Sequence, residues 1–152
     1  MLTRTHLVIS IFFILLFISY VENKFVFVFV VLFATLLVDI DSKYSRLGRK
    51  KIFRPLQFFI RHRTVFHSFI FLILITLFFV WVFPVLAFPF FLGYSVHLFA
   101  DSFTVKGIKP FYPWKKLIYG KLRTGSRMEM VIFVCFLILD ILLILLLVNR
   151  GF

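Results

Sequence analysis

Cysteine and acidic residues are scarce in this sequence. The single cysteine, Cys135, excludes a disulfide framework and a thiolate metal cluster, and its place inside an apolar run predicts a small residue of the core. Only 6 Asp and Glu oppose 18 Lys and Arg. The chain also has no internal repeat, no low-complexity linker and no small-x-small cleavage site after its first apolar run, so we expect one retained integral domain over residues 1–152.

Apolar residues, in contrast, are in excess. They make up 62% of the chain, 25 residues are Phe, and the mean hydropathy is +1.08. A soluble globule of this length could not bury so much apolar surface. The composition therefore predicts a membrane protein.

The apolar residues form stretches that predict about five helices. The stretches are Leu7 to Tyr20, Phe25 to Val38, Val65 to Phe83, Val85 to Ala100 and Val131 to Val148. Only the third and the fifth clearly reach the ~20 residues that a full crossing usually needs. The first two form a hairpin, and Pro84 and Pro89 break the next long run into a second one. We expect an all-α integral membrane bundle of two hairpins plus a C-terminal helix.

Basic residues lie on one side of this bundle. Because each hairpin returns to the side where it started, the N-terminus and the loops 39–64 and 101–129 share one face, which carries 16 of the 18 Lys and Arg. The positive-inside rule places this face in the cytoplasm and the C-terminus outside. Topology and attraction to anionic membrane lipids explain the charge, so nucleic-acid binding is not favoured.

Seven side chains able to bind a metal ion fall on the same face, each near the mouth of an apolar segment. They are His6, Asp39, Asp41, His62, His67, His97 and Asp101. On a helix, residues four apart such as His97 and Asp101 point to one face, and Gly93 would let a neighbouring helix approach closely. His62 and His67 are five apart, which predicts His67 on the helix and His62 on the turn before it.

Each of these residues also has an ordinary explanation. A lone histidine at a membrane interface is more often amphipathic than a ligand, and a lone aspartate at a helix end is usually a cap or a solvated charge. The conjunction favours a metal site, since ionisable groups at hydrocarbon depth persist mainly when they are paired or bound to an ion. Imidazole and carboxylate ligands suit Zn, Mn, Fe or Mg and do not single one out. A divalent ion with an open coordination position activates water, so hydrolysis is the expected reaction class.

Four ordered motifs resemble those of the YdjM-like family of inner-membrane proteins, over roughly residues 5–115. They are Thr5-His6-Leu7; Asp39-Ile40-Asp41-Ser42 followed by Ser45-Arg46-Leu47-Gly48 and Pro55; HRTVFHS from His62 to Ser68; and GYSVHLFADSFTVKGIKPFYP from Gly93 to Pro113. The third motif is similar to the family pattern H-R-G-x-T-H-S but has Thr64 and Phe66 in place of the glycine and the threonine.

The resemblance implies a membrane-bound metal-dependent hydrolase of the inner (plasma) membrane. The family is understood to be distantly related to the all-helical zinc phospholipase C and P1 nuclease group, which implies zinc first among the metals and a phosphoester substrate. The core ligands would be His62, His67, His97 and Asp101, and Asp39, Asp41 and His6 would hold a second ion or orient the first set. Arg63 would stabilise charge on a phosphoryl group. A phospholipid or isoprenoid-type phosphoester, with its tail in the bilayer, would suit this site.

Two interpretations from other classes stay open. The first is a noncatalytic membrane protein for lipid binding or assembly, with a structural ion or none. The second is an ion or proton carrier, for which Asp140 near the middle of the last apolar stretch is the only encouragement, although a hydrogen bond to another helix is the commoner role. The basic, aromatic loop from Gly107 to Glu129 is either an interfacial belt or a lid over the site. The sequence leaves the oligomeric state open.

Overall fold

The computed structural model describes residues 1–41, 65–114 and 116–150, except for the side chain of Asp41. Its elements are α1 (Thr3–Phe17), η1 (Ile18–Tyr20), α2 (Lys24–Leu37), η2 (Val38–Asp41), α4 (Phe69–Val82), α5 (Pro84–Ser102) and α6 (Arg127–Asn149). Each of the five predicted apolar stretches contains a helix, which confirms the all-α class. Outside the helices, the described residues form two isolated β-bridges, Thr104 with Leu122 and Ile108 with Ile118.

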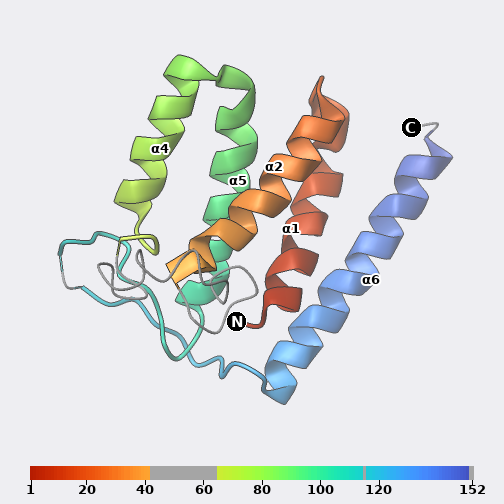
Figure 1. Ribbon diagram of the computed structural model, residues 1–152. Helices are drawn as coiled ribbons and strands as arrows, with labels where there is room; N and C mark the ends of the chain where they lie inside the picture. Colours follow the sequence, from red (N-terminus) through yellow and green to blue (C-terminus); the bar gives the residue numbers. More distant parts are fainter. Residues whose placement is uncertain (42–64, 115, 151–152) are drawn as a thin grey trace.

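The helices run alternately up and down (Figure 1). The N-terminus, the starts of α4 and α6 and the ends of α2 and α5 lie at one end of the bundle, which we call the loop end. The α1–α2 and α4–α5 connections and the C-terminus lie at the other end, which we call the hairpin end. Both predicted hairpins are therefore present, and each returns to the loop end.

Three segments are long and apolar enough to cross a membrane. They are Thr3–Tyr20 with 18 residues, Pro84–Ser102 with 19 and Arg127–Asn149 with 23. The expectation that the third apolar stretch reaches full length is wrong, because α4 has 14 residues and starts only at Phe69. His67 consequently lies in the turn before α4 and not on the helix. Ser68 sets this boundary, since its side-chain oxygen caps the helix by accepting a hydrogen bond from the Ile70 amide.

The two prolines act differently. Pro84 is the first residue of α5 and separates the second hairpin's helices, as predicted, because the first helical position needs no backbone donor. Pro89, which was expected to break the run as well, lies inside α5. Its missing N–H removes one hydrogen bond near the start of the helix, and the remaining turns of α5 continue to Ser102.

α6 exposes most of its apolar surface. Its main packing partner is α1, while α5 packs against α2 and α4. Cys135 lies on the exposed part of α6, so its predicted place in the core is wrong. A helix in contact with lipid and a helix in contact with protein have similarly apolar sequences, because water is absent from both surroundings. The exposed side of α6 is therefore a lipid-facing surface.

Gly93 permits a close crossing of α2 and α5. A Cβ atom added to Gly93 would lie 2.2 Å from the carbonyl oxygen of Val31 on α2. The Thr35 hydroxyl of α2, 3.2 Å from the Gly93 carbonyl oxygen, donates to it across the same crossing. The predicted close approach of a neighbouring helix at Gly93 is thus confirmed.

Replacing Gly93 with alanine should separate α2 from α5. The added methyl group cannot fit beside the Val31 backbone, so we expect a loss of about 1–3 kcal/mol of stability, as for other overpacked cores. Thermal unfolding of the purified protein in detergent would measure it. Ser95→Ala on the same helix is the matched control, because the Ser95 hydroxyl makes no hydrogen bond with the described residues. Equal unfolding temperatures for the two variants would contradict this account.

Candidate metal centre

Five of the predicted ligands meet at the loop end of the bundle. His6 comes from the second turn of α1, Asp39 from η2, His67 from the turn before α4, and His97 and Asp101 from the last turns of α5. They form two overlapping triads, His6–His97–Asp101 and Asp39–His67–His97, in each of which the ligand atoms lie within 4.8 Å of one another. Segments far apart in the sequence thus contribute to one cluster, which we call the His/Asp centre.

The ligand atoms of the His/Asp centre are close enough together that they could hold one cation. His6 Nε2 lies 3.3 Å from Asp101 Oδ1, and His67 Nε2 lies 3.8 Å from Asp101 Oδ2. Asp39 Oδ1 lies 3.7 Å from both His67 Nε2 and His97 Nε2. In a tetrahedral site with bonds of 2.0–2.2 Å, neighbouring ligand atoms are roughly 3.4 Å apart. The donor set therefore fits a divalent ion without large movement.

A hydrogen bond across α2 and α5 fixes which nitrogen of His97 faces the centre. His97 Nδ1 lies 2.8 Å from the carbonyl oxygen of Thr35. A carbonyl can only accept, so Nδ1 carries the proton and Nε2 of the neutral ring keeps its lone pair. This buried Nε2 has no hydrogen-bond partner among the described residues and faces the oxygen of Asp39. A divalent cation placed between these two atoms would be bound by both, so the arrangement fits a metal site.

Asp101 connects the two triads. Its Oδ1 faces His6 of the first triad and its Oδ2 faces His67 of the second, so it would help to hold a metal bound at either triad. The α-amino group of Met1 also donates to Asp101 Oδ1. The rings of His6 and His97 are stacked, with centroids 3.9 Å apart and planes 6° apart. His97 belongs to both triads, but its single lone pair could bind only one ion.

Four of the five ligands of the centre are almost fully buried, and the fifth is partly exposed. His6, His67, His97 and Asp101 are each at most 1% exposed. Burying a carboxylate and imidazoles in an apolar bundle costs several kcal/mol unless they are paired or bound to an ion. The Asp39 side chain, at 20% exposed, is the most accessible ligand of the two triads.

Hydrogen bonds from neighbouring segments hold His67 in place. The Tyr94 hydroxyl on α5 donates to the Phe66 carbonyl oxygen at 2.6 Å, and the Ser68 hydroxyl donates to the Pro110 carbonyl oxygen at 3.0 Å. The amide of Phe69 donates to the same Pro110 oxygen at 2.8 Å. His67 therefore sits on a short turn that is fastened on both sides.

Four further hydrogen bonds support the opposite half of the centre. Glu129 accepts hydrogen bonds from the amides of Leu2 and Gly125, which ties the start of α6 to the start of α1, close to His6. Ser126 caps α6 by accepting a hydrogen bond from the Glu129 amide. The Thr104 hydroxyl donates to the Asp101 carbonyl oxygen at 2.7 Å and stabilises the last turn of α5.

Three predicted site residues lie beyond what the structure describes. His62 and Arg63 fall outside the described residues, and of Asp41 only the backbone, at the end of η2, is described. Asp140, the basis of the carrier interpretation, is not part of either triad. It is buried on α6, and its Oδ1 makes no hydrogen bond with the described residues.

The supporting residues Thr35 and Tyr94 were missed by sequence reasoning. Thr35 interrupts the apolar run of α2, and Tyr94 lies three positions before His97, so each carries a polar group onto a buried helix face. Ser10 is a third case, since its hydroxyl lies 2.8 Å from the Thr35 hydroxyl. The sequence does show that these polar residues interrupt apolar runs. It does not show which groups they form hydrogen bonds with.

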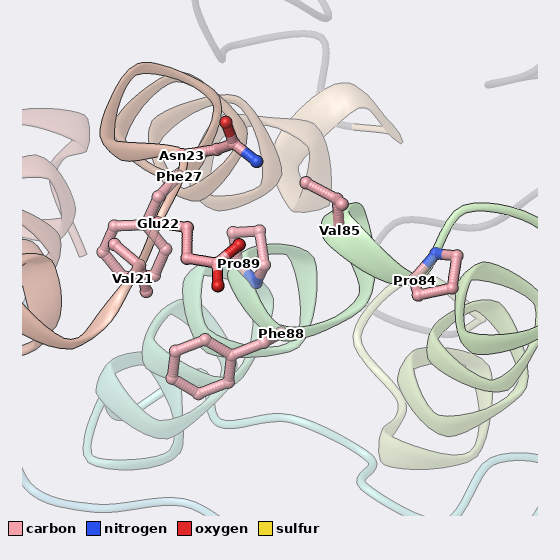
Figure 2. A pocket seen from close by; sticks show the side chains of 8 residues that line it. All are labelled: Val21, Glu22, Asn23, Phe27, Pro84, Val85, Phe88 and Pro89. Carbon is pink, nitrogen blue, oxygen red and sulfur yellow. The ribbon is translucent and has the colours of Figure 1, made fainter.

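A hollow of about 230 Å³ at the hairpin end does not resemble the His/Asp centre. Figure 2 shows it between the α1–α2 connection and the first turns of α5. Phe27 and Phe88, which stack with ring centroids 5.8 Å apart, form part of its lining. Glu22 is the one charged residue among those that line it, and none of them is a histidine. It therefore offers no set of metal ligands.

Together, the apolar helices and the buried polar cluster define a polytopic helical membrane protein with a candidate metal centre at one end. The model of the family described as YdjM inner membrane protein matches residues 1–150 of the chain. The protein belongs to this family, as the four motifs predicted. No curated protein and no solved structure matches the chain, so the family assignment rests on this match.

Metal content tests the centre directly. We expect Asp101→Asn to weaken divalent-metal binding by at least about tenfold, because it removes charge from the carboxylate that faces both triads. Metal analysis of the purified protein by mass spectrometry would measure it. Asp140→Asn is the matched control, since it neutralises another buried aspartate outside the triads. A wild-type protein without stoichiometric metal, together with unchanged content in His97→Ala, would rule the metal centre out.

Proposed function

We propose that the protein is a membrane-bound metal-dependent hydrolase that cleaves an amphiphilic phosphoester. The observation that carries the proposal is the lone pair of His97 Nε2, held toward the Asp39 carboxylate at 3.7 Å by the Thr35 carbonyl. Such preorganised donors are the usual protein contribution to a metal site. The 20% exposure of Asp39 supports a catalytic site over a closed structural one, because a catalytic site keeps a position for water or substrate.

His6, His67, His97, Asp39 and Asp101 would hold the metal in this proposal. Zinc is the first choice, and Mn, Fe and Mg are the alternatives, since none of the described ligands is a thiolate. When bound, a divalent ion would supply Lewis acidity that polarises a phosphoryl oxygen and activates water. Hydrolysis would join the water oxygen to phosphorus, break the ester P–O bond and pass a water proton to the leaving alcohol.

The place of the centre in the bundle suggests the kind of substrate. The His/Asp centre lies at the loop end, and the loop of residues 103–126 at this end contains six lysines and arginines. An anionic phosphate would be attracted to this basic end, while an apolar tail would favour the bilayer. A phospholipid or isoprenoid-type phosphoester meets both requirements. Arg63, which lies outside the described residues, would stabilise negative charge on the phosphoryl group.

Activity should depend on both metal and centre. We expect the purified protein in liposomes to release phosphate from dodecyl phosphate, and a chelator followed by added zinc to abolish and restore the release. His67→Ala should lower the rate by about 100-fold or more, because it removes a predicted ligand. Tyr119→Phe, on the exposed loop, is the control that should keep the wild-type rate. A chelator-resistant rate, or equal rates in both variants, would refute the proposal.

We infer the orientation of the protein in the membrane from its charge. We propose that the loop end faces the cytoplasm, because 16 of the 18 Lys and Arg belong to the N-terminus and the two long loops. The hairpin end and the C-terminus would then face the opposite side.

Cysteine labelling can measure this orientation. In a Cys135→Ser background, an impermeant maleimide should label Tyr20→Cys in right-side-out vesicles and should label Tyr119→Cys only after the vesicles are opened. Both positions are well exposed, at 84% and 67%, so access to the reagent depends on the side of the membrane. The reverse labelling pattern would place the loop end outside.

A further inference from the structure

An apolar pocket of about 240 Å³ lies beside the His/Asp centre. Ile9 and Phe13 of α1, Ala100 and Phe103 near the end of α5, and Ile132 and Phe136 of α6 contribute to its walls. Among the residues that the structure describes, the exposed surface of the pocket comes from apolar atoms only. A sugar, a nucleotide base or a peptide would lose hydrogen bonds with water there and gain none, whereas a hydrocarbon chain would lose nothing.

The pocket and the centre lie close together along two helices and share one residue. Ala100 precedes Asp101 in α5, and Ile9 lies about one helical turn after His6 in α1. Met1 belongs to both, since it lines the pocket and its α-amino group donates to Asp101 Oδ1. A molecule with its polar group at the His/Asp centre would therefore have the apolar pocket within its reach.

The inner walls of the pocket are packed, and its rim is exposed. Ile9 and Ala100 are buried, and Ile132 and Phe136 pack against the cluster that they form. Phe99 and Phe103 meet edge to face with ring centroids 4.9 Å apart, yet they are 62% and 52% exposed. The inner part is thus a packed apolar wall, and the aromatic pair lies at a rim open to the surroundings.

We infer that this pocket binds the hydrocarbon tail of the substrate, next to the phosphate at the His/Asp centre. The inference rests on the proposed function and makes it more specific, because it assigns the tail a site of its own between α1, α5 and α6. The pocket holds only a segment of a long chain, and the remainder leaves past Phe99 and Phe103 into the bilayer. Preference for a phosphoester with a linear chain over a short, water-soluble one follows from the apolar area buried in this pocket.

Photo-crosslinking tests the tail site without requiring turnover. The probe is dodecyl phosphate with a diazirine at the end of the chain, added to the purified full chain in nanodiscs, with excess unlabelled dodecyl phosphate or inorganic phosphate as competitors. We expect labelling at the pocket walls on α1, α5 and α6, displaced by dodecyl phosphate but not by inorganic phosphate. Labels spread over the exposed face of α6, or labels that no competitor displaces, would mean that bulk lipid alone fills the pocket.

Substitutions that fill or enlarge the pocket test whether the tail binds there. Ile132→Trp fills the pocket and should reduce labelling about fivefold, whereas Leu137→Trp, on the exposed part of the same helix, should leave it unchanged. Phe136→Ala enlarges the pocket and should raise the labelling by a hexadecyl probe relative to the dodecyl probe, which keeps the test valid if the tryptophan variant fails to fold. Equal labelling in Ile132→Trp and Leu137→Trp would overturn the tail site.

The two proposals fail in different ways. A protein that releases no phosphate from any phosphoester but is labelled at the pocket walls would lose the hydrolase proposal and remain a binder of alkyl phosphates. A protein that hydrolyses dodecyl phosphate but gives the same labelling in every variant would keep the hydrolase proposal and lose the tail site.

Discussion

The hydrogen bond from His97 Nδ1 to the Thr35 carbonyl is the contact on which the candidate centre depends. It joins α2 to α5 and leaves the other ring nitrogen as an acceptor toward Asp39. It can form because Gly93 lets the two helices approach so closely that a methyl group would not fit. The close packing of α2 against α5 and the orientation of the His97 ring therefore both depend on Gly93.

The polar layer also has to be stable inside an apolar surrounding. Three histidines and an aspartate are almost fully buried, and each comes from a segment held by hydrogen bonds of its own. Tyr94 and Ser68 fasten the turn of His67, Thr104 closes the helix that carries Asp101, and Glu129 fastens the start of α1. Such an arrangement limits the ways in which the side chains can move apart, which is the requirement for preorganised metal ligands.

The sequence predicts the helices well and their ends less well. Apolar runs indicate all five helices because the bilayer selects for hydropathy, and spacing of four indicates the shared face of His97 and Asp101. The first residue of α4 was predicted wrongly, because Val65 and Phe66 are as apolar as the helix itself. The helix starts after them because Ser68 caps it through a local hydrogen bond, which hydropathy does not reveal. The burial of Cys135 was misjudged because lipid and protein interiors have the same polarity. The roles of Thr35 and Tyr94 depend on contacts between distant segments, which no spacing within one segment reveals.

The order of the ligands along the chain has a consequence for biogenesis. His6 is synthesised first, and its partners His97 and Asp101 emerge only with α5. During co-translational insertion, the imidazole of His6 therefore lies in the membrane or at its surface before the Asp101 carboxylate that completes its triad has been synthesised. Assembly of the centre is therefore a late event, and a chain truncated before α5 would expose an incomplete polar group to cellular quality control.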